Sequence, residues 1–275
     1  MKRLLFLILF FGYSLCFAQE DALKISFIDV GRGDAILIQS NNQCALVDTG
    51  TLLSGYQLLD YLQAHKITDI QHLIITHPHA DHLSGIFFIL PKLNVKYLYD
   101  NAGSIDIWDN AIQAWYEQVF RGKNNYRLLK EGDMLRMGEA TLQVLWPAAG
   151  KQQGSGNHNS IVIKIRYKNF SCLLSADIDF AAEEQLLLKH ADIKADVLKI
   201  SHHGGREATN IGFLKAVKPK IAIICVDEKS KRGYPEKRVL NMLTAENIKT
   251  YRTDKSGTIT ISVNNDSRFI VSTEK

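Results

Sequence analysis

The stretch THPHADH at residues 76–82 holds three histidines and one aspartate. It follows the apolar run 71–76, which predicts a short buried strand. Imidazole and carboxylate are the ligands of hydrolytic zinc sites, and they also suit Mn²⁺ or Fe²⁺. Because the chain has only nine histidines, a solvated polar loop is a poor explanation for three of them here. The stretch therefore predicts a metal site with the candidate ligands His77, His79, Asp81 and His82.

Outward from this stretch, strands and helices recur in a similar order in both halves of the chain. The apolar patterns predict strands at 22–30, 35–39, 44–47, 71–76, 95–99, 141–146, 160–167, 170–175, 197–201, 221–226, 248–251, 258–263 and 269–272. They predict helices at 56–65, 83–90, 105–120, 180–189, 211–217 and 236–246. Such an order indicates two sheets packed face to face with helices outside. No linker separates the halves, so one domain is expected.

The motif His77-x-His79-x-Asp81-His82 resembles the signature of the metallo-β-lactamase superfamily. The resemblance implies a four-layer αββα sandwich of two mixed sheets with outer helices. It also implies two divalent metal ions, Zn²⁺ or Mn²⁺. The ligands that it implies are His77, His79, Asp81, His82, His158, Asp177 and His203.

The resemblance assigns further roles to residues after other predicted strands. Asp48 would hold the histidine loop by hydrogen bonds, although a turn aspartate is the simpler explanation for it alone. Asp177 would bridge the two metals, and its simpler explanation is a helix N-cap, for which Asp179 is also free. His203 is assigned to metal and His202 to substrate, but the reverse remains open. At the third motif, Asn159 is the alternative to His158.

Several stretches resemble the branch of this superfamily found at the end of the DNA-uptake protein ComEC. They are residues 27–35 (FIDVGRGDA), 159–160, 200–204 (ISHHG) and 251–259, and the resemblance spans about residues 23–263. Asp34 resembles a family aspartate near the site, with a structural role expected.

Three departures from that branch concern the substrate side. Arg32 stands where glutamine is usual, and Gly205-Arg206 stands where small hydroxyl residues are usual. Tyr234 replaces a histidine in Gly233-Tyr234-Pro235. A tyrosine hydroxyl can still donate to a phosphate oxygen, so Tyr234 is expected to bind substrate.

The resemblance implies a hydrolase that uses a metal-activated hydroxide, with Asp81 orienting the nucleophile and His202 stabilising the anionic transition state. A phosphodiesterase or nuclease is the leading hypothesis, with DNA as the first substrate to test. A basic run could contact phosphates, although a solvated charged face is the simpler explanation. That run is Lys229, Lys231, Arg232, Lys237 and Arg238.

Three other functions remain as alternatives. One is a phosphodiesterase for a small or envelope substrate, as in the phosphorylcholine esterases. A second is a β-lactamase, which fits the motifs less well. The third is a non-catalytic accessory of DNA uptake, in which ligands would be expected to be lost.

The first residues predict a signal peptide at 1–18, which leaves a hydrolase domain at 19–275. Lys2 and Arg3 precede an apolar run that is too short to span a membrane, and Ala18 suits cleavage. Lipidation at Cys16 is disfavoured because Leu15 is large for the preceding position. The protein is therefore expected to be exported to the periplasm or beyond, with no stable membrane span in the mature chain.

The charge and the remaining cysteines exclude some other classes of protein. The net charge of +4, to which Lys2 and Arg3 contribute, is too small to argue for nucleic-acid binding by itself. Cys44, Cys172 and Cys225 lie in apolar runs, which predicts buried free thiols rather than a disulfide framework. Nothing in the sequence predicts the oligomeric state.

Overall fold

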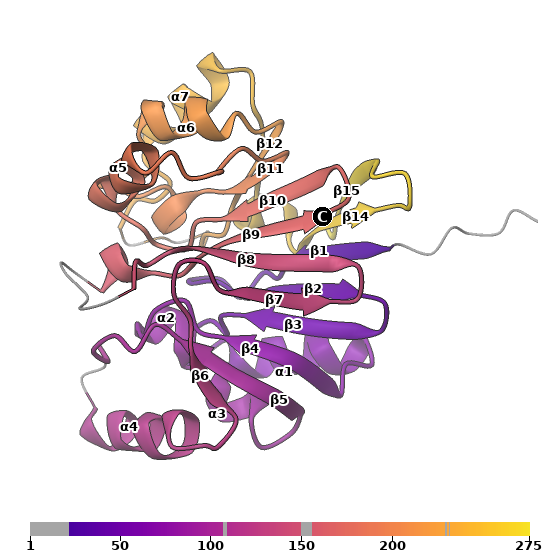
Figure 1. The fold of residues 1–275 in the computed structure, drawn as a ribbon, viewed down its shortest axis with the longest axis vertical. Coiled ribbons are helices and arrows are strands. Elements are labelled where there is room, and N and C mark those ends of the chain that lie inside the picture. Colours follow the sequence, from indigo (N-terminus) through magenta and orange to yellow (C-terminus); the bar gives the residue numbers. More distant parts are fainter. Residues whose placement is uncertain (1–21, 107–108, 150–155, 229, 231) are drawn as a thin grey trace, which may run out of the picture.

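The computed structural model describes residues 22–106, 109–149, 156–228, 230 and 232–275. The expected signal peptide lies outside these residues. Two mixed β-sheets face each other, and helices cover both outer faces (Figure 1). This arrangement confirms the αββα sandwich expected from the sequence.

The first sheet contains, within the described residues, eight strands in a mixed order. They are β15 (Phe269–Thr273), β14 (Ile259–Val263), β1 (Leu23–Phe27), β2 (Ile36–Ser40), β3 (Gln43–Val47), β4 (Asp69–Ile74), β5 (Asn94–Asp100) and β6 (Tyr126–Leu128). Strands β15 to β3 pair antiparallel, and β3 to β6 pair parallel.

The second sheet repeats this change from antiparallel to parallel pairing. Its strands, again within the described part, are β13 (Lys249–Arg252), β12 (Ile221–Ile224), β11 (Val197–Lys199), β10 (Phe170–Leu174), β9 (Val162–Tyr167), β8 (Ala140–Trp146) and β7 (Met134–Met137). Strands β7 to β10 pair antiparallel, and β10 to β13 pair parallel.

Three clusters of buried apolar side chains hold the layers together. Successive side chains of a strand point to opposite faces of its sheet, and this determines which cluster each residue joins. In β3, Ala45 and Val47 pack between the sheets, whereas Cys44 and Leu46 pack under the first helical layer. In β11, Val197 lies between the sheets and Leu198 faces the second helical layer. One face of each sheet therefore builds a shared core, and the other binds helices.

The helices divide between the two outer layers. The first layer holds α1 (Gly55–Ala64), α2 (Ala80–Leu83), α3 (Ile86–Ile89), α4 (Asn110–Trp115) and the π-helical turn η1 (Tyr116–Arg121). The second holds α5 (Phe180–Leu188), α6 (Ile211–Val217) and α7 (Lys237–Ala245). The short elements are η2 (Asn157–Asn159), η3 (Ser201–Gly204) and α8 (Thr253–Ser256). No helix in the described ranges is long and apolar enough to cross a bilayer.

Some predicted boundaries were wrong. The helix expected at 105–120 begins only at Asn110, because Asp109 caps it by accepting from the amides of Ala111 and Ile112. Asp106 instead forms a β-bridge with His79. Strands β6 and β7 were not predicted, since their side chains are mostly exposed and lack an apolar pattern. The prediction of buried free thiols is confirmed for Cys44, Cys172 and Cys225.

Candidate metal centre

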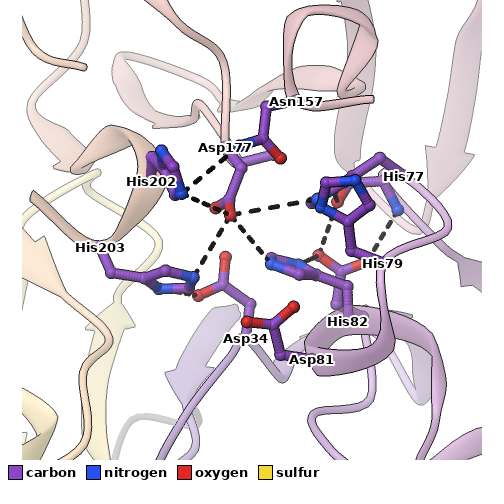
Figure 2. A network of polar contacts seen from close by, with 12 residues as sticks. Asp34, His77, His79, Asp81, His82, Asn157, Asp177, His202 and His203 are labelled. Atoms are coloured by element: carbon purple, nitrogen blue, oxygen red, sulfur yellow. Dashed lines mark hydrogen bonds and ion pairs between the residues drawn. The ribbon is translucent and has the colours of Figure 1, made fainter. Parts of the chain in front are cut away.

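The loops after the parallel strands of both sheets meet at one edge of the sandwich. The carboxyl ends of parallel strands share an edge, which is where open α/β sheets place their ligands. Strands β3 and β4 bring Asp48 and residues 76–82, and β10 and β11 bring Asp177 and residues 201–204. Figure 2 shows His77, His82, Asp177, His202 and His203 directed toward one another.

Asp177 lies at the middle of this group and is almost completely buried. Its Oδ2 is 3.2 Å from Nε2 of His82 and 3.3 Å from Nε2 of His203. It is 4.0 Å from Nε2 of His77 and 3.9 Å from Nε2 of His202. Imidazoles from both sheets thus surround one carboxylate.

Asp48 orients the histidine loop from beneath. Its backbone is left-handed, with φ of 59°, and its carboxylate is buried. The carboxylate accepts hydrogen bonds from the amide of Thr76 at 2.7 Å and from its hydroxyl at 2.8 Å. It also lies 2.8 Å from Nδ1 of His82. If His82 donates through Nδ1, its Nε2 lone pair points at Asp177, as in metal sites whose histidines are held by a carboxylate.

His77 and His203 are held in the same way. Nδ1 of His203 lies 2.9 Å from the carbonyl oxygen of Cys225, which can only accept. Nδ1 of His77 lies 3.1 Å from the hydroxyl of Thr76, whose own proton goes to Asp48. Both rings therefore donate through Nδ1 and present an Nε2 lone pair toward the centre.

This donor set fits a divalent cation. Nε2 of His77, Nε2 of His203 and Oδ1 of Asp177 are buried and make no hydrogen bond within the described residues. Lone pairs facing a buried carboxylate are unfavourable unless a cation lies between them. Within the described residues, three triads have ligand atoms within 4.8 Å of one another, namely His77–His82–Asp177, Asp81–His82–His203 and Asp34–Asp48–His82.

Burial and charge determine the protonation of the group. Burial lowers the pKa of His77 well below its ordinary value, which keeps the ring neutral as a ligand requires. Burial also disfavours a charge on His82, but Asp177 and Asp48 outweigh it and raise its pKa well above normal. Burial would raise the pKa of Asp177, yet His203 and His82 hold it well below normal. The centre therefore keeps its carboxylate ionised.

Asp81 stands at the edge of the centre, where Arg32 contacts it. Nε of Arg32 donates to Oδ2 of Asp81 at 2.8 Å. Gly33, with φ of +96°, packs directly on the Asp81 backbone, because an added Cβ would lie 1.8 Å from its carbonyl oxygen. Only glycine permits this approach, so the turn at 31–33 brings Arg32 onto Asp81.

His79 lies beside the triads. Its ring centroid is 4.4 Å from that of His77, and its Nε2 is 3.6 Å from Oδ2 of Asp106. Gly156 covers it closely, since an added Cβ there would lie 2.5 Å from Nε2. The structure thus places His79 next to the centre with an exposed carboxylate as its partner.

The structure places His158, an expected metal ligand, against Asp179 and Trp146. Its Nδ1 is 2.9 Å from Oδ1 of Asp179, and its ring lies edge-on to Trp146. Residues 157–159 form a single 3₁₀ turn, in which successive side chains point in different directions. Asn157 is the member of this turn that reaches the centre, with Nδ2 3.4 Å from Nε2 of His202 (Figure 2). In the alternative, Asn159, the backbone carbonyl accepts from Asn101.

The two adjacent histidines lie in consecutive left-handed conformations, with φ of 48° at His202 and 56° at His203. This backbone turns both rings toward Asp177, whereas a regular strand would point them apart. His203 is the more buried, and the His202 ring lies edge-on to Tyr234. The geometry favours His203 as the metal ligand and His202 as the substrate contact.

Tyr234 and Pro235 pack against the two glycines that follow the histidine pair. A Cβ on Gly205 would lie 2.8 Å from Cζ of Tyr234, and one on Gly204 would lie 2.7 Å from Cβ of Pro235. Any larger residue at 205 would displace the tyrosine. The Gly-Gly pair therefore sets the position of the candidate substrate-binding ring.

Lys199 is a site residue that the sequence analysis did not select. It is completely buried, and its Nζ pairs with Oδ2 of Asp34 at 2.5 Å and with Oδ1 of Asp177 at 3.7 Å. Burial opposes its charge, but Asp34 and Asp177 outweigh burial and raise its pKa. Asp34 also lies 3.5 Å from Nδ1 of His203. The available signal was a lysine inside the predicted apolar strand at 197–201.

Arg238 belongs to the basic run that was expected to contact phosphates, and the structure shows it hydrogen-bonded within the fold. Arg238 donates to the carbonyl oxygens of Thr209 and Ala208 at 3.0 and 2.7 Å, so it ties α7 to the loop before α6. Arg232 is exposed and lines a cavity beside the centre. Lys229 and Lys231 lie outside the described residues.

The chain matches known proteins over most of its length. The model of the metallo-beta-lactamase superfamily matches residues 28–227. ComE operon protein 3 of Bacillus subtilis is 29% identical over 264 residues, covering 89% of this chain and 33% of that protein. Competence protein ComA of Neisseria gonorrhoeae is 24% identical over 242 residues, covering 87% and 32% respectively. The chain thus spans about a third of the length of these curated relatives.

A solved structure agrees with the fold. The metallo-beta-lactamase fold protein YhfI from Bacillus subtilis superimposes with a TM-score of 0.54 at 14% identity. The match covers 84% of this chain and 96% of that one. At this level of identity the likeness concerns the architecture alone.

Proposed function

The chain belongs to the metallo-β-lactamase superfamily, and on that premise we propose that it is an exported metal-dependent phosphodiesterase, with DNA as the first substrate to test. The observation that carries the proposal is the convergence of imidazole Nε2 atoms from both sheets on the Asp177 carboxylate. The competence proteins among its relatives motivate DNA as the first substrate. Export rests on the sequence of residues 1–18.

The residues divide into metal-holding and substrate-facing groups. His77, His82 and Asp177 would hold one ion, and Asp81 and His203, which lie beside His82, would contribute to holding a second. Bound divalent ions would supply Lewis acidity and lower the pKa of water. Asp48 and Lys199 would keep the ligands in place, which is a role for hydrogen-bonded neighbours in metal sites.

The other groups act on the water and on the substrate. Asp81 accepts a hydrogen bond from the attacking water and so orients it, and Arg32 helps to keep this carboxylate ionised. Burial lowers the pKa of His202, so the ring is neutral near pH 7 and donates an N–H to a phosphoryl oxygen. The Tyr234 hydroxyl, beside His202, donates to a second oxygen.

The test is hydrolysis of bis-p-nitrophenyl phosphate and of plasmid DNA by the purified chain with added Mn²⁺ or Zn²⁺. We expect metal-dependent cleavage of both, and a loss of about a hundredfold or more in Asp81→Ala. The matched control is Asp69→Ala, because Asp69 is exposed at the opposite end of β4.

Each result leads to a different conclusion. Cleavage of the small diester alone would move the proposal to a small or envelope substrate. No turnover of either substrate by metal-loaded protein would contradict the phosphodiesterase and leave a binding accessory of DNA uptake. Equal activity in Asp81→Ala would contradict the role of this carboxylate.

A further inference from the structure

Beside the candidate centre lies a cavity of about 510 Å³ whose lining includes two arginines. Asp81 and His203 also line it, so the cavity adjoins the metal-holding residues. We call it the Arg32–Arg232 cavity.

Arg32 is placed to bind an anion while it stays attached to the protein. Within the described residues, its hydrogen bond to Asp81 uses Nε, and its side chain is 54% exposed. A guanidinium carries five N–H donors in a planar fork, which suits phosphate oxygens. One edge can therefore hold Asp81 while other donors face a ligand.

Arg232 supplies a second cation to this cavity, which Asp227 also lines. Arg232 is exposed. Together with Tyr234 it also lines a neighbouring cavity of about 360 Å³ that contains His202 and Arg206. Arg232 thus lines both cavities and lies near His202, the candidate substrate contact.

The same cavity has an apolar wall. Val30, Leu53 and Val226 line it, and the side chain of Leu53 is 92% exposed at its rim. Exposed leucine is common, but here it adjoins two guanidinium groups and a candidate catalytic centre. Such a lining matches a ligand with an organic group next to an anionic one.

We propose that the Arg32–Arg232 cavity binds a second phosphate of the substrate, separated from the scissile phosphodiester by an organic group. The inference rests on the proposed function and narrows the class of substrate. The substrate is a phosphodiester that carries a further anionic group, as a nucleotide unit of a chain does, and not a diester with a neutral or cationic substituent.

The experiment compares three chromogenic esters. They are thymidine 5′-(p-nitrophenyl phosphate), the same ester with a 3′-phosphate, and p-nitrophenyl phosphorylcholine. We expect kcat/KM to be about tenfold higher or more with the 3′-phosphate. The reason is that the free energy of one charge-assisted hydrogen bond corresponds to roughly a tenfold change in binding. The phosphorylcholine ester, whose second group is cationic, should be cleaved most slowly.

Variants assign the preference to the two arginines. Arg232→Gln should remove the preference mainly through KM for the 3′-phosphorylated ester. Arg32→Gln should remove it too and should also lower kcat for both thymidine esters, because Arg32 holds Asp81. Arg268→Gln, an equal charge change on the exposed β14–β15 turn, should keep the full preference.

Some results would overturn the inference even if the enzyme is a phosphodiesterase. These are equal kcat/KM for the two thymidine esters, faster cleavage of the phosphorylcholine ester, or an unchanged preference in Arg232→Gln. If no ester is cleaved, the proposed function fails and calorimetry decides the inference. Tighter binding of thymidine 3′,5′-bisphosphate than of thymidine 5′-monophosphate, lost in Arg232→Gln, would support the cavity; equal binding would contradict it.

Discussion

At the scale of single residues, hydrogen bonds at Nδ1 decide what each histidine can do. Asp48, Cys225 and Thr76 occupy the Nδ1 side of three rings and leave the opposite nitrogen toward Asp177. The Nε2 of His202 lies 3.9 Å from Oδ2 of Asp177 and also 3.4 Å from Nδ2 of Asn157. We therefore propose separate roles for His202 and His203.

Replacing each of the two adjacent histidines tests that separation. His203→Ala should weaken metal binding by about a hundredfold or more, since removing even a hydrogen-bonded neighbour of a ligand costs about tenfold to a hundredfold. His202→Ala should keep the metal content and lower kcat by about a hundredfold, because a donor to the transition state is lost. Metal titration and steady-state kinetics measure both.

The matched control for both variants is His65→Ala, because His65 is exposed at the end of α1. A loss of metal in His202→Ala with normal metal binding in His203→Ala would reverse the two assignments.

At the scale of elements, Glu183 links α5 to α6 behind the histidine pair. Its carboxylate accepts from the amides of Thr209 and Asn210 at 2.6 and 2.8 Å, and from the Asn210 side chain at 2.7 Å. Asn210 in turn caps α6 by accepting from the amide of Phe213. Asp179 caps α5, which leaves Asp177 for the centre.

The buried Glu183 predicts a pH-dependent stability. Burial raises its pKa from 4.5 to about 7 despite the amide donors. The folded protein then binds this proton more tightly than the unfolded chain does. The stabilising contribution is complete below pH 4.5 and is lost as the pH rises through about 7.

Relative to Glu183→Gln, the free energy of unfolding of the unmodified protein should fall by about 3 kcal/mol between pH 4.5 and 8. Denaturant unfolding of both proteins across this range measures the difference, and only the change with pH matters. Glu184→Gln, at the exposed neighbouring position, should show no such trend. Parallel pH profiles for Glu183→Gln and the unmodified protein would contradict the prediction.

At the scale of the whole molecule, the candidate ligands come from loops of both sheets. His77 and His82 follow β4 of the first sheet, and Asp177 and His203 follow β10 and β11 of the second. A bound cation would therefore join the two halves of the sandwich. Binding to the folded state alone stabilises it by mass action.

Metal should accordingly raise the melting temperature. At a hundredfold excess over Kd, the gain is about 2.7 kcal/mol, or roughly 5–10 °C for a chain of this size. Thermal unfolding with EDTA and with Mn²⁺ or Zn²⁺ measures the shift. His77→Ala should remove most of it and His65→Ala none, while identical melting with and without metal would rule out the centre.

The sequence by itself determined the layers of the sandwich and the residue types of the centre. Apolar alternation within five-residue strands decides which face is buried, and the ligand motifs directly follow those strands. These are local signals. They place His77, His82, Asp177 and His203 each within a few residues of a strand end or a predicted strand end.

Only the tertiary structure decided which side chain of the 157–159 turn reaches the centre. It also decided which neighbouring residues contact the candidate ligands. Asn157 faces inward because Trp146 and Asp179, distant in sequence, hold His158 away. Lys199 lies beneath Asp177 because β11 pairs beside β10, and Arg32 meets Asp81 because Gly33 packs on its backbone. Contacts between segments far apart in the chain depend on packing, which no short pattern of residues contains.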